Sequence, residues 1–398
     1  MPKWKKMTVG DLCDTISDTY RGDDKDVVLI NTSDVLEGKV LNHQVVENKN
    51  LKGQFKKTFK KNDILYSEIR PANKRYAFVD FGDTDNYIAS TKLMVLRPRK
   101  DVVRPRFLFS FLASKSVLEE LQQLAETRSG TFPQITFSSE LAPTPINVPD
   151  LETQDRIVGI LDVIEGKIST NAEINKNLEQ QTQELFKAWF VTFETFGGKM
   201  PSSWSVAKLG DVATIKTNSF SPAKNPTVML EHYSIPAFDE QKYPVFELAS
   251  NVKSNKYILT DNSVMISKLN PGTKRVWRPM CISEFAVSST EFIIFEANDP
   301  TYKDYVFSVI DSPAFSDWMC AHTTGSTNSR QRTTPSTTLE FQIALPTQEI
   351  VSDFCKIVTP MYDMIAQNTC ENRKLAVFRD SLLPKLMSGE LDVSNIEI

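Results

Sequence analysis

The stretch NDILYSEIRPANKR occupies residues 62–75, and a second version of it, NSVMISKLNPGTKR, occupies residues 262–275. Each version has apolar residues followed by Pro and then Lys-Arg, a pattern typical of a β-strand that enters a tight turn. The motif Trp-x5-Gly-Asp also occurs twice, starting at Trp4 and at Trp204. Because the repeats of solenoids and propellers run about 20–50 residues, this much longer period predicts two copies of a whole domain with its connector.

The repeat predicts how the chain is divided. Residues 1–150 and 198–346 are expected to be globular, whereas residues 151–197 and 347–398 are expected to be helical connectors, the second with a C-terminal tail. A chain of 398 residues should form two or more domains, because single cores stop growing near about 250–300 residues. The predicted fold class is α+β, with two globular α/β units in a pseudo-two-fold repeat, separated by two long helices that pack as an antiparallel coiled coil.

Local composition predicts strands and helices inside the globular units. β-branched and aromatic residues bounded by Gly, Pro, Asn and Asp predict strands at residues 27–31, 63–69, 76–81, 93–96, 263–269 and 291–295. Apolar spacing predicts helices at residues 106–126 and 303–320. A polar loop rich in small hydroxyl residues follows each of these helices, at residues 127–134 and 323–332.

Apolar residues step alternately by four and three along each connector, which predicts a helix with a coiled-coil seam. The predicted seam of the first connector contains Ile157, Leu161, Ile164, Ile168, Asn171, Asn175, Leu178 and Leu185. The predicted seam of the second connector, at an offset of 197 residues, contains Met361, Ile365, Asn368, Asn372, Leu375 and Leu382.

Two asparagines lie in the middle of each predicted seam, and Asn171 and Asn175 correspond to Asn368 and Asn372. Polar residues in a seam cost stability but fix the register of the helices, so the two polar centres are expected to align. A solvent-exposed face is the alternative interpretation of these asparagines. Pro360 predicts a kink in the second helix, or a new helix that starts after a short first segment.

Composition excludes several classes of protein. The chain is 40% apolar and 24% charged, has no run of about 20 apolar residues that could span a bilayer, and lacks the apolar core of a signal peptide. Five cysteines without a CxxC pair predict reduced thiols in a cytoplasmic protein and no zinc site. The net charge is −4, yet basic clusters occur at residues 49–61, 97–106 and 268–278, each of them a nucleic-acid contact or a solvated face.

Catalytic and cofactor motifs are absent from the sequence. There is no GxxxxGK[ST], no GxGxxG after a strand, no HExxH and no Asn-Pro-Pro-Tyr or Asp-Pro-Pro-Tyr, and the three histidines have no ligand spacing. The run Pro149-Asp150-Leu151-Glu152 resembles the start of a nuclease metal motif, but no lysine follows in place. A helix N-cap is therefore the predicted role of Asp150, and the sequence predicts neither a catalytic nor a metal site.

The order of these parts resembles the specificity subunits of type I restriction-modification systems. The resemblance is carried by Trp-x5-Gly-Asp-[Leu/Val] at residues 4–12 and 204–212, and by Ser-Gly-Thr and Gly-Ser-Thr in the two polar loops. VPDLETQDRIVGILDVIEGKISTN (148–171), its counterpart LPTQEIVSDFCKIVTPMYDMIAQN (345–368), and LLPKLMSGEL (382–391) extend it over essentially the whole chain. The second connector departs from the pattern, because it only partly matches Leu/Val-Pro-x-x-Glu-x-Gln.

The resemblance implies that residues 1–150 and 198–346 are target recognition domains, each reading one half of a split double-stranded DNA sequence. It implies that the connectors space these domains and bind two modification subunits, which carry S-adenosylmethionine and methylate adenine N6. Restriction subunits with ATP and Mg would complete a translocating nuclease, whereas this chain would hold no cofactor and contact no membrane. A helix of about 33 residues spans about 50 Å, enough to hold two readers about one DNA turn apart. The alternative is a coiled-coil scaffold or adaptor without direct DNA contact.

DNA contacts are expected in two patches of each unit, because Arg can grip guanine with two donors, Asn can do so with adenine, and Lys suits phosphate. The turn after the repeated strand supplies Arg70, Asn73, Lys74 and Arg75 in the first unit, and Lys268, Asn270, Thr273, Lys274 and Arg275 in the second. The polar loop supplies Arg128, Ser129, Thr131 and Gln134, and then Ser326, Thr327, Arg330, Gln331 and Arg332. An ordinary charged turn and a flexible surface loop are the alternatives. The copies differ in these patches, as two different half-sites require.

Overall fold

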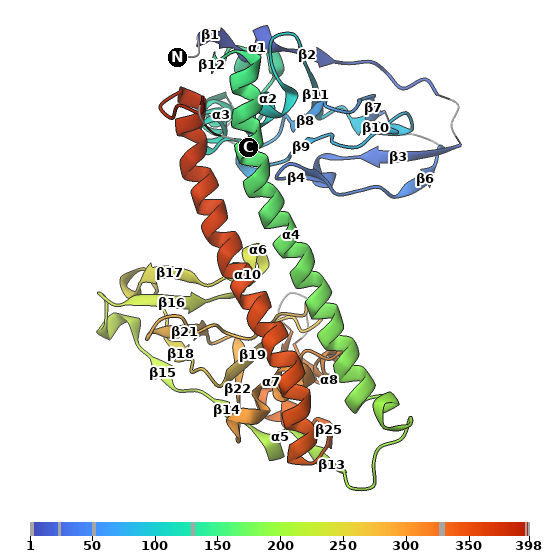
Figure 1. Cartoon of the computed structure of the whole chain (residues 1–398), viewed down its shortest axis with the longest axis vertical. Coiled ribbons are helices and arrows are strands. Elements are labelled where there is room, and N and C mark those ends of the chain that lie inside the picture. The colour runs from blue at the N-terminus through green and yellow to red at the C-terminus, as the bar shows by residue number, and fades with distance from the viewer. Residues whose placement is uncertain are drawn as a thin grey trace. The chain divides into compact units, whose positions relative to one another are not determined.

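A computed structural model describes residues 4–22, 25–49, 53–128, 132–325, 331–394 and 396. It divides the chain into two compact units (Figure 1). Unit 1 consists of Met1–Gly166 with Leu375–Ile398, and unit 2 consists of Lys167–Lys374. The long helices α4 (Leu151–Phe190) and α10 (Gln348–Ser388) each contribute residues to both units. Each unit is therefore a globular part with a segment of both helices.

Unit 1 contains two four-stranded sheets. The first is antiparallel, in the order β2 (Cys13–Ile16), β11 (Leu93–Pro98), β8 (Ile64–Ser67), β9 (Tyr76–Phe78). The second has the order β6 (Val45–Glu47), β3 (Asp26–Ile30), β10 (Tyr87–Ser90), β7 (Phe55–Lys57), with β3 and β10 parallel. Short pairs join β1 (Lys5–Thr8) to β12 (Pro145–Val148) and β4 (Val35–Leu36) to β5 (Lys39–Val40). The helices are α1 (Val9–Leu12), α2 (Pro105–Leu112), α3 (Lys115–Arg128) and the single turns η1 (Thr32–Asp34), η2 (Pro71–Asn73) and η3 (Phe137–Leu141).

Unit 2 repeats this arrangement. Its antiparallel sheet has the order β14 (Ala213–Lys216), β22 (Phe292–Ala297), β19 (Ser263–Ser267), β20 (Val276–Trp277). Its second sheet has the order β15 (Ser219–Phe220), β18 (Lys256–Ile258), β21 (Ala286–Ser289), β16 (Met229–Tyr233), β17 (Val245–Leu248). Short pairs join β13 (Ser205–Lys208) to β25 (Gln342–Leu345) and β23 (Thr323–Thr324) to β24 (Arg332–Thr333). The helices are α5 (Leu209–Val212), α6 (Ile235–Gln241), α7 (Lys303–Ile310), α8 (Pro313–Ala321), α9 (Pro335–Thr338) and the turns η4 (Glu194–Phe196), η5 (Pro222–Lys224), η6 (Ala249–Asn251) and η7 (Pro300–Tyr302).

The sequence repeat is thus a structural repeat. Strand for strand, β2-β11-β8-β9 corresponds to β14-β22-β19-β20, and the central parallel pair β3–β10 corresponds to β16–β21. The predicted α+β class with two repeated units and two long helices is confirmed. The edge strand β15 and the helix α6 between β16 and β17 are among the elements of unit 2 that have no named counterpart in unit 1.

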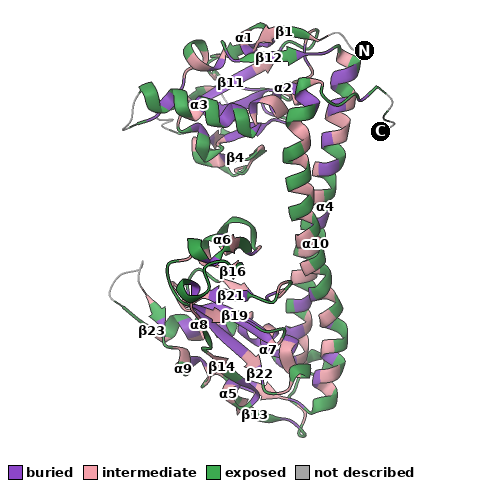
Figure 2. Ribbon diagram, turned by 90° about the vertical axis from the view of Figure 1, so that its left-hand side faces the viewer, coloured by how far each residue is buried: buried purple, intermediate pink, exposed green. Residues whose placement is uncertain are grey.

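Each globular part packs its helices and its antiparallel sheet into one core (Figure 2). In unit 1, Phe107 and Leu121 from α2 and α3 join the same apolar cluster as Ile157 of α4 and Leu386 of α10. In unit 2, Phe186 of α4 and Phe354 of α10 join the corresponding cluster. The long helices are therefore fixed to the globular part within each unit by shared apolar contacts.

Two predicted helices are each split into two. Residues 106–126 form α2 and α3, and residues 303–320 form α7 and α8. The second split has a local cause, because the Ser312 hydroxyl accepts the Phe315 N–H at 3.2 Å and Pro313 occupies the first turn of α8. The prediction of one continuous helix was wrong at both places, since the apolar spacing runs on across the break.

The prediction of a new helix near Pro360 was also wrong, because α10 continues through this residue. A proline inside a helix loses one backbone hydrogen bond and costs about 3 kcal/mol. The neighbouring side chains of Val358 and Tyr362 are buried in the core of unit 2. Their packing offsets the cost of the proline. No helix in the described part of the chain is both long and apolar enough to cross a membrane.

The four central asparagines of the long helices pair across them within unit 2. Asn171 Nδ2 donates to Asn372 Oδ1, and Asn368 Nδ2 donates to Asn175 Oδ1, both at 2.9 Å. Asn175 Nδ2 also reaches the Ile365 carbonyl at 3.3 Å, while Asn372 Nδ2 reaches the Ile168 carbonyl at 3.2 Å. Each of these bonds has a counterpart in which α4 and α10 exchange roles, because Asn171 and Asn175 correspond to Asn368 and Asn372. In unit 2 the two helices therefore run antiparallel around a local pseudo-two-fold axis.

Candidate nucleic-acid interface

In unit 1, the turn after β8 lies beside the loop after α3. The Arg70 N–H donates to the Pro133 carbonyl at 3.1 Å, and the Ile135 N–H donates to the Glu68 carbonyl at 2.9 Å. An antiparallel bridge between Ile69 and Gln134 lies between these two bonds. The turn and the described end of the loop, which the sequence predicted as separate patches, are therefore joined by backbone hydrogen bonds in this unit.

Unit 2 has the same construction. The Asn270 N–H donates to the Gln331 carbonyl at 2.9 Å, and the Thr333 N–H donates to the Lys268 carbonyl at 3.1 Å. Leu269 and Arg332 form the bridge between them. We call this construction the turn–loop edge: residues 68–74 with 132–135 in unit 1, and residues 268–274 with 331–333 in unit 2.

The turn of each edge has an unusual backbone. Arg70 has φ 44° and ψ 79°, and Asn270 has φ 50°. The left-handed region is costly for residues other than glycine, and such residues concentrate at functional sites. The hydroxyls of Ser67 and Ser267 accept the N–H two residues on, from Ile69 at 3.0 Å and from Leu269 at 3.2 Å. The serine shared by the two copies therefore supports the turn in both units.

The shared arginine of the turn points back into the protein in both units. Arg75 donates to the carbonyls of Ser33 at 3.0 Å and Val35 at 3.3 Å. Arg275 forms two bonds to the carboxylate of Asp239 in α6, at 2.6 and 2.8 Å. Different partners thus brace the turn from the same position, although Arg275 Nη1 is buried without a hydrogen-bond partner among the described residues.

Most other predicted basic residues also have acidic partners. Lys74 pairs with Glu37 at 2.7 Å and Lys274 pairs with Asp311 at 2.6 Å. Arg128 pairs with Glu140 at 3.1 Å, and Arg332 binds both carboxylate oxygens of Glu291, at 3.0 and 3.2 Å. The bond to Glu291 raises the pKa of Arg332. The net positive charge of each edge is therefore smaller than the sequence suggests.

A few predicted residues remain available. Arg70, Asn73 and Thr273 are exposed, and their side chains form no hydrogen bond or ion pair with the described part of the chain. Asn270 is half-buried, and its buried Oδ1 has no partner among the described residues. Gln134, Lys268 and Gln331 are half-buried. The remaining predicted residues, Ser129, Thr131, Ser326, Thr327 and Arg330, lie outside the described residues.

Sequence reasoning missed Gln122 as part of the edge. Its side-chain oxygen accepts the Ala72 N–H at 3.0 Å, and its amide donates to Glu126 at 2.7 Å. This contact ties α3 to η2 across 50 residues of chain. No local pattern marks Gln122, since a glutamine on an amphipathic helix is ordinarily a surface residue.

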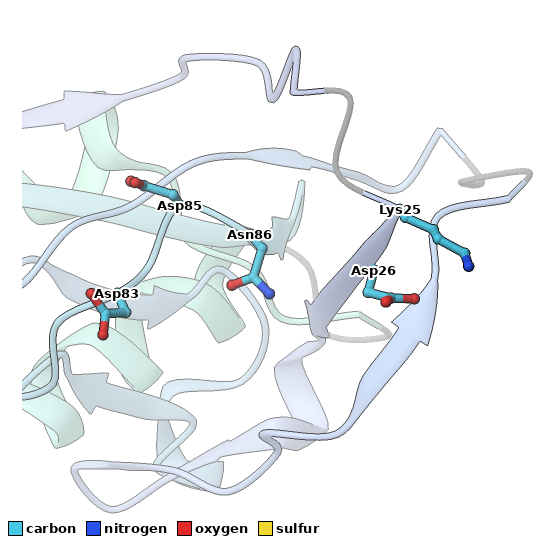
Figure 3. A pocket seen from close by; sticks show the side chains of 5 residues that line it. All are labelled: Lys25, Asp26, Asp83, Asp85 and Asn86. Atoms are coloured by element: carbon cyan, nitrogen blue, oxygen red, sulfur yellow. The ribbon is translucent and has the colours of Figure 1, made fainter.

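An open pocket of about 380 Å³ lies elsewhere in unit 1. It is lined by Lys25, Asp26, Asp83, Asp85 and Asn86, at the start of β3 and in the loop before β10 (Figure 3). Three carboxylates against one lysine disfavour a phosphate-bearing ligand. Within the described ranges, no group of three or more His, Cys, Asp or Glu side chains is placed to hold a metal ion.

Known proteins resemble this chain along its whole length. A model of the type I restriction modification DNA specificity domain matches residues 1–180. The Type I restriction enzyme HindI specificity subunit of Haemophilus influenzae is 31% identical over 98% of this chain and 100% of that protein. The MjaIX specificity subunit of Methanocaldococcus jannaschii is 26% identical over 75% of this chain and 71% of that protein. A crystal structure of a type I restriction-modification S subunit from M. genitalium, 16% identical, has the same fold, with a TM-score of 0.61 over 97% of this chain and 96% of that one.

Proposed function

Since the chain belongs to the specificity subunits of type I restriction-modification systems, we propose that each of its two units reads one half of a bipartite DNA sequence. Members of this family recognise DNA sequences and are not themselves the catalytic subunits. We assign the base contacts to the turn–loop edge of unit 1 and to the corresponding edge of unit 2.

One observation carries the assignment. Both units hold the same pair of segments side by side by equivalent backbone hydrogen bonds, with Arg70 and Asn270 at equivalent left-handed positions. The backbone is shared, whereas the side chains at these positions differ in kind. A common frame with different polar side chains is what two readers of different half-sites need.

The available side chains suit base edges. An arginine such as Arg70 can donate two hydrogen bonds to guanine, and an asparagine such as Asn73 can bond in two places to adenine. Phosphate contacts supply most of the affinity of DNA-binding proteins. Because Lys74, Lys274 and Arg332 are paired with carboxylates, we expect the chain alone to bind DNA weakly and to need its partner subunits.

The long helices have a second part in the proposal. α4 contains 40 residues, about 60 Å at about 1.5 Å per residue, and we propose that α4 and α10 set the distance between the two half-sites. We also propose that they bind two methyltransferase subunits, which would hold S-adenosylmethionine, and that restriction subunits would bring ATP and Mg. All five cysteines are unpaired, which supports a cytoplasmic location.

A gel-shift titration tests the proposal, with the chain alone and with the methyltransferase subunits, on DNA that carries the sequence the complex methylates. Replacing Arg70 by Ala should weaken binding by the complex about 5- to 150-fold, the range for one two-pronged base contact. Lys115→Ala is the control, because Lys115 is an exposed cation of α3 that pairs with Glu119 and lies outside the turn–loop edge. Equal losses in the two variants would contradict a base contact by Arg70.

The same titration separates the rival function. A coiled-coil adaptor without DNA contact is favoured by the ion pairs that occupy most basic groups of the edges. An adaptor would still assemble with the methyltransferase subunits, but the assembly would show no preference for the methylated sequence over unrelated DNA. Sequence preference in the assembly that disappears with Arg70→Ala would exclude the adaptor.

A further inference from the structure

Phe132 lies in the loop half of the turn–loop edge of unit 1, and its side chain is 49% exposed. Single exposed apolar residues are common on protein surfaces and need no explanation by themselves. The neighbourhood of Phe132 is unusual, because the five preceding residues are Thr-Arg-Ser-Gly-Thr. Phe132 is thus a large apolar residue at the end of an otherwise hydrophilic stretch of sequence.

The backbone joins the residue after Phe132 to Arg70. Pro133 follows Phe132, is buried, and accepts the Arg70 N–H at 3.1 Å through its carbonyl. A residue before proline is restricted to extended conformations, which limits the positions that Phe132 can take. Phe132 and Arg70 are both exposed and therefore lie on the same turn–loop edge, whose two halves the Arg70–Pro133 hydrogen bond joins.

This pair of side chains matches base edges better than phosphates. A guanidinium group can bind either, but a phenyl ring gains nothing from a charged phosphate. In the major groove, the 5-methyl group of thymine is the apolar group by which bases differ, and phenylalanine is among the side chains that contact it. An arginine with a neighbouring phenylalanine can accordingly read polar and apolar features of adjacent base pairs.

The apolar group belongs to one unit only. By the equivalent backbone bonds of the two edges, Phe132 and Pro133 correspond to Arg330 and Gln331 of unit 2, and Arg330 lies outside the described residues. A contact made by Phe132 would therefore act on the half-site of unit 1 and leave the other half-site unaffected. The loss of affinity should therefore occur at one half-site and be absent at the other.

We propose that Phe132 packs on the 5-methyl group of a thymine in the half-site read by unit 1. The proposal rests on the proposed function, since it requires unit 1 to read DNA. Phe132 becomes a residue that determines specificity through an apolar contact, beside the polar contact of Arg70. Loss of one buried methyl group corresponds to an affinity loss of about fourfold.

The test uses the full chain with its methyltransferase subunits and DNA in which each thymine of the target is replaced in turn by deoxyuridine. The complex should lose about fourfold in affinity at one thymine, and only in one half-site. Phe132→Ala should abolish the difference between thymine and deoxyuridine at that position, whereas Phe132→Leu should keep most of it. Phe246→Ala is the matched control, because Phe246 is a phenylalanine of unit 2 that is 43% exposed on β17.

The outcomes separate this inference from the function on which it rests. If the complex shows no sequence preference on any DNA, the proposed function fails before Phe132 is tested. If the complex prefers its target but no thymine shows a Phe132-dependent loss, the inference is overturned and the proposed function stands. A loss that disappears with Phe246→Ala as well would also overturn the inference, because the effect would then not be local to the edge of unit 1.

Discussion

The buried asparagines that pair α4 with α10 in unit 2 should lower the stability of this unit while they fix the register of the two helices. Asn171 is 1% exposed, and its Nδ2 donates to Asn372 Oδ1 at 2.9 Å and to Glu371 Oε2 at 2.6 Å. Its own Oδ1 is buried and has no partner within the described part of the chain. We consider the replacement of Asn171 and Asn372 by Leu, singly and together.

The expected free energies of unfolding follow from these contacts. Asn372→Leu alone removes its cross-helix bonds to Asn171 and to the Ile168 carbonyl, and should cost about 1–2 kcal/mol, at about 1 kcal/mol for each neutral hydrogen bond. The double replacement also removes the buried Oδ1 of Asn171, whose lack of a partner costs about 1–3 kcal/mol. Apolar pairs in place of buried polar pairs are often neutral or stabilising, so the double variant should be at least as stable as the parent.

The assay is calorimetric unfolding of the full chain, because the two units need not unfold in one transition. For a unit of roughly 200 residues, about 1 kcal/mol corresponds to about 2–4 °C in Tm. Asn177→Leu is the control, since Asn177 is an exposed residue of the same helix and its replacement should change stability by less than about 0.5 kcal/mol. A double variant whose destabilisation equals the sum of the two single effects would refute the reasoning, because the pair would then be uncoupled.

Two further predictions concern the ends of the long helices. Gly389 has φ +77°, and a Cβ there would lie 2.7 Å from Trp4 Cε2. Gly389→Ala should therefore lower the free energy of unfolding by about 2–4 kcal/mol, through backbone strain and overpacking. Gly272→Ala, whose Cβ would have nothing within 4 Å, is the control in the same thermal unfolding, and equal effects of the two changes would contradict the prediction. The Asp150 carboxylate accepts the Thr153 N–H at 2.9 Å, and this backbone bond lowers its pKa from 3.8. Because the pKa of Asp150 is lower in the folded state, the stabilisation by this carboxylate is present above pH 3.8 and is lost as the pH falls toward the folded value. Asp150→Asn should therefore flatten the acid limb of a curve of unfolding free energy against pH. An unchanged acid limb would count against the helix N-cap at Asp150.

The features that the sequence predicted correctly are those with a local or periodic cause. The strands expected at residues 63–69 and 263–269 are β8 and β19, because apolar and β-branched residues bounded by a turn favour a buried strand wherever it is placed. The connectors expected from alternating steps of four and three are α4 and α10. Duplication strengthened both predictions, since each pattern could be read twice in one chain.

The features that could not be predicted depend on partners far away in the chain. Nothing near Arg75 indicates that it donates to Ser33, which lies 42 residues earlier, and nothing near Lys274 indicates its pairing with Asp311. Composition shows that a turn is basic. The segments that the fold packs against the turn determine whether its guanidinium group faces solvent or a carbonyl. The continuation of α10 through Pro360 has the same origin, because buried neighbours outweigh a local penalty.

The two copies in one chain allow the roles of turn residues to be separated. Ser67 supports the turn backbone, and Lys74 and Arg75 bind other parts of the protein, as do the residues shared with them in unit 2. The exposed positions without such bonds, such as Arg70 and Asn73, are those where the copies differ. Residues that the copies share therefore maintain the shape of the edge, and residues that differ determine what the edge reads. It follows that changes at the shared Lys-Arg pair should alter stability in both units, whereas changes at Arg70 should alter sequence preference at one half-site and leave stability near that of the parent.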